Sequence, residues 1–343
     1  MSRFVFVTGT LAAKALERTL SGMKPDWDYE IRVLAITVAA LMNTTYLRRH
    51  LVAPISGTVV IPGSCRVDAE GLERELGVPV VRGPNDLRDL PAFFGQRDQR
   101  TSTDCEVSTG SRILAEIVDA WRMSPDEIVD RARYYRSSGA DIIDIGCSPG
   151  DEFPHLAQSV ERLRSEGFEV SVDSLNPREI LEACRAGASY VLSVNSSNLE
   201  VARDLDAAVV VIPDPDGGLD SLARNVERLE KWGVRHILDP ILDPINMGFC
   251  SSLARFFEVR RRFPEKPVLM GIGNVTELTD ADSTGLNALL LGIATELEAE
   301  YVLTTEACPR TRGAVREACA ARVLMTRARR LGVPPKNLGD ALI

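Results

Sequence analysis

The feature that most constrains this chain is an alternation of strands and helices that restarts near Ser111 and continues toward the C-terminus. Short apolar runs recur about every 20 to 35 residues, the size of one strand and helix unit in an eight-fold barrel. Several runs follow a glycine, as in Ser138-Gly139-Ala140 and Ala186-Gly187-Ala188, where a glycine would end the preceding helix. The predicted strands are Ile113 to Ile117, Asp141 to Ile145, Glu169 to Val172, Tyr190 to Val194, Ala208 to Ile212, His236 to Leu238, Pro267 to Met270 and Tyr301 to Leu303.

These eight strands predict a (β/α)8 TIM barrel over residues 111–343, with a helical extension at its C-terminal end. Parallel strands that are joined by helices cross over right-handedly, and eight in succession close most naturally into a barrel. An open doubly wound sheet is the alternative.

Residues 1–85 predict a smaller Rossmann-like α/β domain, and the polar, turn-rich residues 86–110 predict a linker. The expected strands of the small domain are Phe4 to Val7, Ile31 to Ile36, Thr58 to Ile61 and Val78 to Val81, with helices over Leu11 to Leu20, Val38 to Leu51 and Asp68 to Leu76. The first turn, Thr8-Gly9-Thr10, offers backbone amides to an anion. It lacks the full glycine pattern of dinucleotide sites, so dinucleotide binding is not expected.

Composition excludes several classes of partner. The net charge of -9 disfavours a nucleic acid, whose phosphates require a clustered basic surface. No apolar run is long enough to span a membrane or to form a signal peptide. The seven cysteines are scattered and form no C-x-x-C pair, which indicates reduced thiols and a cytoplasmic location. With only three histidines beside them, a structural zinc site is not expected.

A carboxylate or an amide follows or ends each barrel strand. Active sites of this fold lie at the carboxyl ends of the strands, so these side chains are expected to share one rim. Helix capping explains some of them but not the whole set. They are Glu116 or Asp119, Asp144, Asp173, Asn195, Asp214, Asp239, Asn274 and Glu306.

This set of side chains favours ligand binding over nucleophilic catalysis. No histidine stands at a strand end, so a Ser-His or Cys-His pair is disfavoured. Aspartate and asparagine suit a ligand that presents several ring N–H donors and a carbonyl, as a pterin or guanine-like edge does. A Mg²⁺ site is the rival interpretation, because clustered carboxylates also form an oxygen cage.

Four ordered motifs resemble those of dihydropteroate synthases. Gly139-Ala140-Asp141-Ile142-Ile143-Asp144-Ile145-Gly146 resembles the second-strand motif, and Ser171-Val172-Asp173-Ser174 resembles the third-strand S-V-D-T. Val194-Asn195 and Leu238-Asp239-Pro240, ahead of Gly248-Phe249, resemble the fourth-strand motif and the D-P-G-x-G-F motif. The resemblance implies that Asp173, Asn195 and Asp239 hold a reduced pterin, and we add Asp144 and Asn274 as pterin-binding candidates.

The chain departs from that family where the synthase handles phosphate. The first strand reads Leu114-Ala115-Glu116-Ile117, Gly273-Asn274-Val275 replaces S-R-K, and Thr304-Thr305-Glu306 replaces R-x-H. Losing these cations puts ordinary dihydropteroate synthesis in doubt. Gly271-Ile272-Gly273-Asn274 is instead similar to the G-x-S-N of pterin-binding methyltransferases.

The whole arrangement resembles dihydropteroate synthase-related proteins of organisms that use tetrahydromethanopterin. It implies a pterin-binding transferase in the biosynthesis or use of that one-carbon carrier, with Glu116 or Glu306 as acid or base. A non-catalytic pterin carrier or assembly protein, a pterin-dependent methyltransferase and a metal-dependent enzyme are the alternatives. The stripe Leu289, Leu290, Ile293 and Leu297 indicates core packing first and a homodimer face second.

Overall fold

The computed structural model describes residues 2–52, 54–96, 110–148, 150–339 and 341–342. Their contacts form two compact units. The first contains the described residues up to 96 together with 327–339, and the second contains 110–326 with 341–342. The greater part of the predicted linker, residues 97–109, lies outside the described residues.

The second unit is an eight-stranded parallel barrel, as predicted. Its strands pair in the order β10-β9-β8-β7-β6-β5-β12-β11, and a parallel bridge between Leu238 and Val268 joins the two ends of this order. The strands are β5 (Arg112–Ile117), β6 (Ile142–Gly146), β7 (Val170–Asp173), β8 (Tyr190–Val194), β9 (Ala208–Val211), β10 (His236–Leu238), β11 (Leu269–Gly271) and β12 (Tyr301–Thr305).

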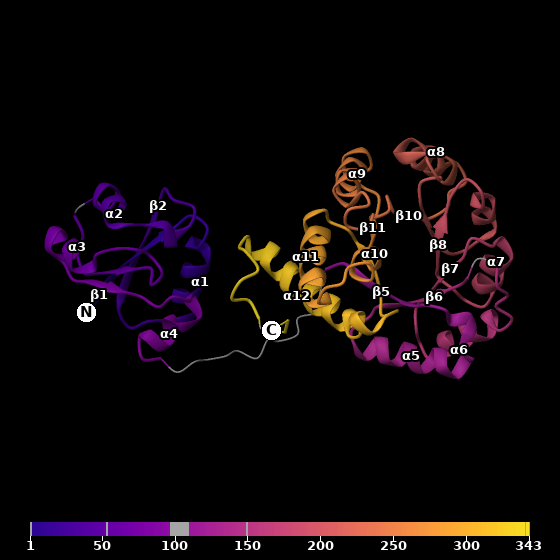
Figure 1. The fold of residues 1–343 in the computed structure, drawn as a ribbon, viewed down its shortest axis with the longest axis horizontal. Coiled ribbons are helices and arrows are strands. Elements are labelled where there is room, and N and C mark those ends of the chain that lie inside the picture. The colour runs from indigo at the N-terminus through magenta and orange to yellow at the C-terminus, as the bar shows by residue number, and fades with distance from the viewer. Residues whose placement is uncertain (1, 53, 97–109, 149, 340, 343) are drawn as a thin grey trace. The chain divides into compact units, whose positions relative to one another are not determined.

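Helices lie around the outside of these strands (Figure 1). Ser124 begins the first of them with a capping box, in which its hydroxyl accepts from the Glu127 N–H. Within the described ranges, no helix is long and apolar enough to cross a bilayer. The helices are α5 (Pro125–Ser137), α6 (Leu156–Ser165), α7 (Pro177–Arg185), α8 (Gly218–Lys231), α9 (Phe249–Arg262), α10 (Gly273–Thr276), α11 (Ser283–Glu296) and α12 (Ala314–Leu331), with the 3₁₀ segment η4 (Leu199–Asp204) between β8 and β9.

Alternate strand residues pack on opposite faces of the barrel wall. Ile113 and Ala115 join the apolar layer shared with the helices, whereas Leu114 joins an apolar layer with Ile142 and Leu192. Near the amino ends of the strands, Arg112 donates to Glu169 at 2.6 Å. The apolar layer around Leu114 and this ion pair fill the barrel interior near the amino ends of the strands. The inward-facing positions nearer the carboxyl ends therefore remain for polar side chains.

The first unit is a four-stranded parallel sheet with helices on both faces (Figure 1). Leu47 and Leu72 are buried in the core on one face, and Leu16, Leu20 and Leu90 in the core on the other. The strand order is β2-β1-β3-β4, which confirms the predicted small parallel α/β domain. Its elements are β1 (Arg3–Gly9), α1 (Ala13–Met23), β2 (Asp28–Leu34), α2 (Thr44–His50), β3 (Thr58–Ile61), α3 (Ala69–Leu76), β4 (Val80–Arg82) and α4 (Leu90–Phe93).

The boundaries of the small unit differ from the predicted ones. The expected helix over Val38 to Leu51 is interrupted, because Asn43 caps a new helix by accepting from the Tyr46 N–H. Residues 87–94, predicted as linker, pack into the first unit, since Leu90 is buried there and the Phe94 ring lies 4.7 Å from that of Trp27. Residues 327–339, predicted as a barrel extension, also group with the first unit.

Helix α11 offers a test of the core with a matched control. Leu290 is 1% exposed and its neighbour Leu289 is 59% exposed. We expect Leu290→Ala to lower the free energy of unfolding by about 2–5 kcal/mol, because it leaves a cavity in the core, and Leu289→Ala to change it by less than about 0.5 kcal/mol. Urea titration followed by circular dichroism measures both, and equal effects would contradict the packing of this helix.

Candidate functional site

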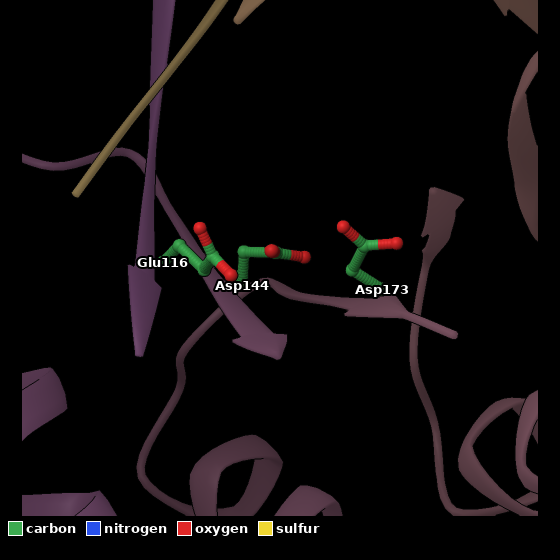
Figure 2. A group of neighbouring side chains, drawn as sticks. All are labelled: Glu116, Asp144 and Asp173. Carbon is green, nitrogen blue, oxygen red and sulfur yellow. The ribbon is translucent and has the colours of Figure 1, made fainter. Parts of the chain in front are cut away.

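Three acidic side chains from neighbouring strands meet at the carboxyl end of the barrel. Glu116 lies on β5, Asp144 on β6 and Asp173 at the end of β7, and one oxygen of each lies within 4.8 Å of the others. Figure 2 shows the carboxylates side by side, with Asp144 in the middle. Glu116 and Asp144 are register partners, so the pleat turns both side chains to the same face of the barrel wall.

Asp144 is completely buried, and only one of its oxygens is satisfied. The Ser171 hydroxyl donates to its Oδ1 at 2.5 Å. Its Oδ2 has no hydrogen-bond partner among the described residues. Native proteins seldom leave a buried carboxylate oxygen unpaired, because the lost hydration is not replaced.

Burial keeps this group from ionising fully at neutral pH. Desolvation, followed by the charge of Asp173, raises the pKa of Glu116 to about 7. Burial and the charges of Asp173 and Glu116 raise the pKa of Asp144, and burial raises the pKa of Asp173. The three side chains therefore hold protons, or they require a cation or hydrogen-bond donors from a ligand.

A fourth carboxylate, Asp239, follows β10. Its Oδ1 accepts from the Ile241 N–H at 2.7 Å. Burial raises its pKa to about 7, and the nearby charge of Asp173 adds to the effect. Asp173 and Asp239 are thus two half-buried acceptors, and the charge of Asp173 acts on Asp239.

A β-bulge in β8 places a serine against Asp173. The register between β8 and β9 shifts between Val191 and Val194, and Ser193 has a φ of 66°. The Ser193 side chain opposes the rise in the pKa of the Asp173 carboxyl group. Bulges that redirect a side chain in this way are common beside functional sites.

A cavity of about 1350 Å³ opens above Asp173 and Asn195, which both line it. Its walls come from the segments after β6, β7, β8, β9 and β10. Among the described lining residues the carboxylates outnumber the two arginines, Arg178 and Arg255. The acidic side chains are Asp151, Glu152, Asp173, Glu179, Glu182, Asp214, Asp216 and Asp243.

Asn195 lines the cavity and also shapes the turn that follows β8. Its Oδ1 accepts from the backbone N–H of Ser197 at 3.0 Å and from the Ser197 hydroxyl at 2.6 Å. The side-chain oxygen is therefore occupied, and the NH₂ group is the part that remains for a ligand's acceptor.

Two predicted site residues lie apart from the carboxylate group. Asn274 is exposed on α10, where its Nδ2 donates to the Leu242 carbonyl at 2.9 Å. Glu306 accepts from the Tyr134 hydroxyl at 3.1 Å and from the Val315 N–H at 3.2 Å, so its carboxylate binds elements outside the barrel wall. Both side chains connect loops and helices, which leaves Glu116 as the candidate acid or base.

Sequence reasoning missed several side chains that shape the site. Glu277, just after α10, contributes to the raised pKa of Glu116. Arg255 of α9 donates to the Ile241 carbonyl at 2.7 Å and to Asp243 at 2.9 Å, which fixes the segment after β10. Ser171 could have been found, because it stands two residues before Asp173 and so faces the same way; neither Glu277 nor Arg255 carries such a signal.

Two family models match parts of this chain. Residues 115–215, from β5 to just past β9, match a family described as "Pterin binding enzyme", and residues 2–85 match a "Family of unknown function (DUF6513)". Residues 115–215 include Glu116, Asp144, Asp173 and Asn195 but neither Asp239 nor Asn274.

Relatives differ in how much of this chain they match. An uncharacterized protein of Methanocaldococcus jannaschii, MJ0107, is 27% identical over 99% of this chain and 77% of its own length. The dihydropteroate synthase type-2 of Escherichia coli is 26% identical over 50% of this chain and 73% of its own length. The first similarity therefore includes both units, and the second only part of the chain.

Solved structures identify the barrel type. The Yersinia pestis dihydropteroate synthase in a sulfonamide complex aligns with 66% of this chain and 96% of its own, at a TM-score of 0.52 and 19% identity. The Xanthomonas albilineans enzyme, solved with 7,8-dihydropteroate, aligns with 66% and 95%, at a TM-score of 0.50 and 21% identity. The barrel is dihydropteroate synthase-like in fold.

The raised pKa values predict how stability depends on pH. The folded protein holds protons on Glu116 and Asp239 up to pH about 7, whereas the unfolded chain releases them near pH 4. The free energy of unfolding should therefore decrease as the pH rises from about 4 to about 7. At pH 8, without ligand or divalent ions, we expect Glu116→Gln to raise it by roughly 1–3 kcal/mol.

Urea titrations between pH 4 and pH 8 measure this dependence. Glu152→Gln, at an exposed carboxylate of the same cavity, is the matched control and should keep the wild-type slope. An unchanged slope in Glu116→Gln would contradict the assignment of a proton to this side chain.

Proposed function

We propose that the barrel binds a reduced pterin at the carboxyl ends of β7, β8 and β10 and catalyses a group transfer. The pathway we propose is the biosynthesis or use of tetrahydromethanopterin. The match of residues 115–215 to pterin-binding enzymes supports the ligand. The motif resemblance supports the pathway.

The observation that carries the proposal is Asp173, which lines the cavity together with Asn195 and whose charge also acts on Asp239 after strand β10. A pterin presents a ring N–H and an exocyclic NH₂ on one edge, and a carboxylate can accept from both. These donors would offset the cost of ionising a buried aspartate. Asp144 is completely buried, so we assign it to the polar floor below the ligand, beside Glu116.

Glu116 is the residue we propose as the acid or base. Its pKa of about 7 suits proton transfer to or from a ring nitrogen at neutral pH. The acidic lining of the cavity favours a neutral or cationic reaction partner over a pyrophosphate. Methyl transfer or another transfer without a phosphate leaving group therefore fits this site better than dihydropteroate synthesis.

We expect Asp173→Asn to weaken the binding of a tetrahydropterin by about 100-fold or more. The carboxylate offers two charged acceptor oxygens, whereas the amide offers one neutral acceptor oxygen and an NH₂ donor. Isothermal titration of the full chain under anaerobic conditions measures the dissociation constant. Asp216→Asn, at an exposed carboxylate of the same cavity, should bind like the wild type. Equal affinities of all three proteins would contradict the proposed site.

Turnover separates an enzyme from a carrier. We expect Glu116→Gln to retain pterin binding within a few-fold of the wild type and to lose transfer activity by about 100-fold or more, the usual contribution of a general acid or base. Chromatographic assays with methylated tetrahydropterin and a thiol acceptor measure it. A chain that binds the pterin but turns over no pterin substrate would support the carrier alternative instead.

One observation favours a second candidate, a divalent-cation site at Glu116, Asp144 and Asp173. Asp144 is completely buried and its Oδ2 is unpaired among the described residues, and one carboxylate oxygen each of Glu116, Asp144 and Asp173 lies within 4.8 Å of the others. Oxygen ligands of this kind suit Mg²⁺ or Mn²⁺. Such an ion would neutralise the carboxylates and supply charge for a bound substrate, and the three side chains would hold it.

A metal titration tests this second candidate. After dialysis against a chelator, Mn²⁺ binding is followed by electron paramagnetic resonance in the wild type, in Asp144→Asn and in the Glu152→Gln control. We expect Asp144→Asn to weaken binding by about tenfold or more if these residues hold the ion. Identical titrations of wild type and Asp144→Asn would rule out this site.

A further inference from the structure

The first unit contains a cavity of its own, of about 270 Å³, at the carboxyl ends of its strands. Residues that follow all four strands line it, among them Ala12 after β1, Val38 after β2, Ser64 after β3 and Asn85 after β4. We propose that this cavity binds a small organic anion, with an apolar or planar body and one carboxylate or phosphate group.

The strand order places the cavity where ligands bind in open parallel sheets. In the order β2-β1-β3-β4, the chain passes from β1 to β2 on one side and then crosses to β3 on the other. The connections after β1 and β3 therefore leave in opposite directions, and a crevice opens between them. Thr8 on β1 and Pro62 to Ser64 after β3 line the cavity at this point.

The floor of the cavity accepts an apolar body. Phe6, Leu16, Val60 and Leu90 line it, and all four are buried in the core on one face of the sheet. Backbone forms one wall, since a Cβ on Gly63 would lie 2.5 Å from the Gly83 carbonyl oxygen. A ring or short chain of modest size can lie between this floor and that wall.

The charges of the lining select an anion. No aspartate or glutamate is present among the described residues that line the cavity, whereas Lys336 is. Ala12 and Ala15, in the first turn of α1, also line it, and that helix begins without a side-chain cap or an acidic residue in its first turn. The partial positive charge of the helix amino end is therefore not offset there.

The first turn of the small unit does not supply the donors for this anion. The amides of Thr10 and Leu11 already donate to the Ile36 and Thr37 carbonyls, at 2.9 and 3.2 Å. The turn Thr8-Gly9-Thr10 therefore does not offer these donors to a ligand. Lys336 and the first turn of α1 remain as the positive groups that face the cavity.

This site is separate from the proposed pterin site in its residues and in its chemistry. The barrel cavity is lined by carboxylates, and this one has none among its described lining residues. The family model that covers residues 2–85 has no assigned function. The two proposals can therefore fail independently.

Methyl NMR of the full chain, with labelled isoleucine, leucine and valine, tests the proposal. The probes are phenyl phosphate, benzoate, inorganic phosphate and uncharged benzyl alcohol. We expect phenyl phosphate or benzoate to shift the methyl signals of Val38 and Leu87, which line this cavity, and not those of Ile212 and Ile241, which line the barrel cavity. Benzyl alcohol and inorganic phosphate should bind about threefold or more weakly, because one lacks the charge and the other the apolar body.

Two pairs of variants complete the test. Ala15→Phe fills the cavity and should abolish the shifts, and Ala13→Phe, on the same helix but outside the lining, should not. Lys336→Gln, at an exposed position, should weaken anion binding by about two- to tenfold, whereas Lys14→Gln should not. Shifts confined to Ile212 and Ile241, equal binding of benzyl alcohol, or equal binding by Lys336→Gln and the wild type would each overturn the proposal.

Discussion

The physical constraint on which the barrel site depends is the cost of burying carboxylates together. Glu116, Asp144, Asp173 and Asp239 come from four strands or strand ends, and burial raises the pKa of each. The charge of Arg255 opposes the rise at Asp239, and among the described residues no lysine or arginine acts on the other three. Protons, a cation or the N–H groups of a ligand must therefore supply what the protein does not, which makes this end of the barrel a binding site.

Barrel geometry explains why the carboxylates gather there. The ion pair between Arg112 and Glu169 and the apolar layer around Leu114 occupy inward positions nearer the amino ends of the strands. The last inward position of each strand has no neighbour above it, so a polar side chain can remain there. Ser171 donates to Asp144 and so fixes the direction of that carboxylate.

The cavity of the small unit lies in the corresponding place but has a lining of opposite charge. It also lies at the carboxyl ends of parallel strands, but its described lining contains Lys336 and no carboxylate. Parallel sheets leave open ends of this kind because every connection must return across the sheet. What differs between the two cavities is the set of side chains on the connections, which are mostly acidic in the barrel and include no carboxylate among the described lining residues of the small unit.

The sequence by itself determined the parallel barrel and the small sheet, because the alternation of strands with helices and the recurrent glycines are local properties of the chain. Tertiary structure alone decided that Glu306 binds Tyr134 and Val315, that Glu277 acts on Glu116, and that residues 327–339 group with the first unit. It also decided that the Thr10 and Leu11 amides are already paired. The physical reason is that the direction and partner of a side chain beyond a strand end depend on packing between segments distant in sequence, and local spacing carries no record of that packing.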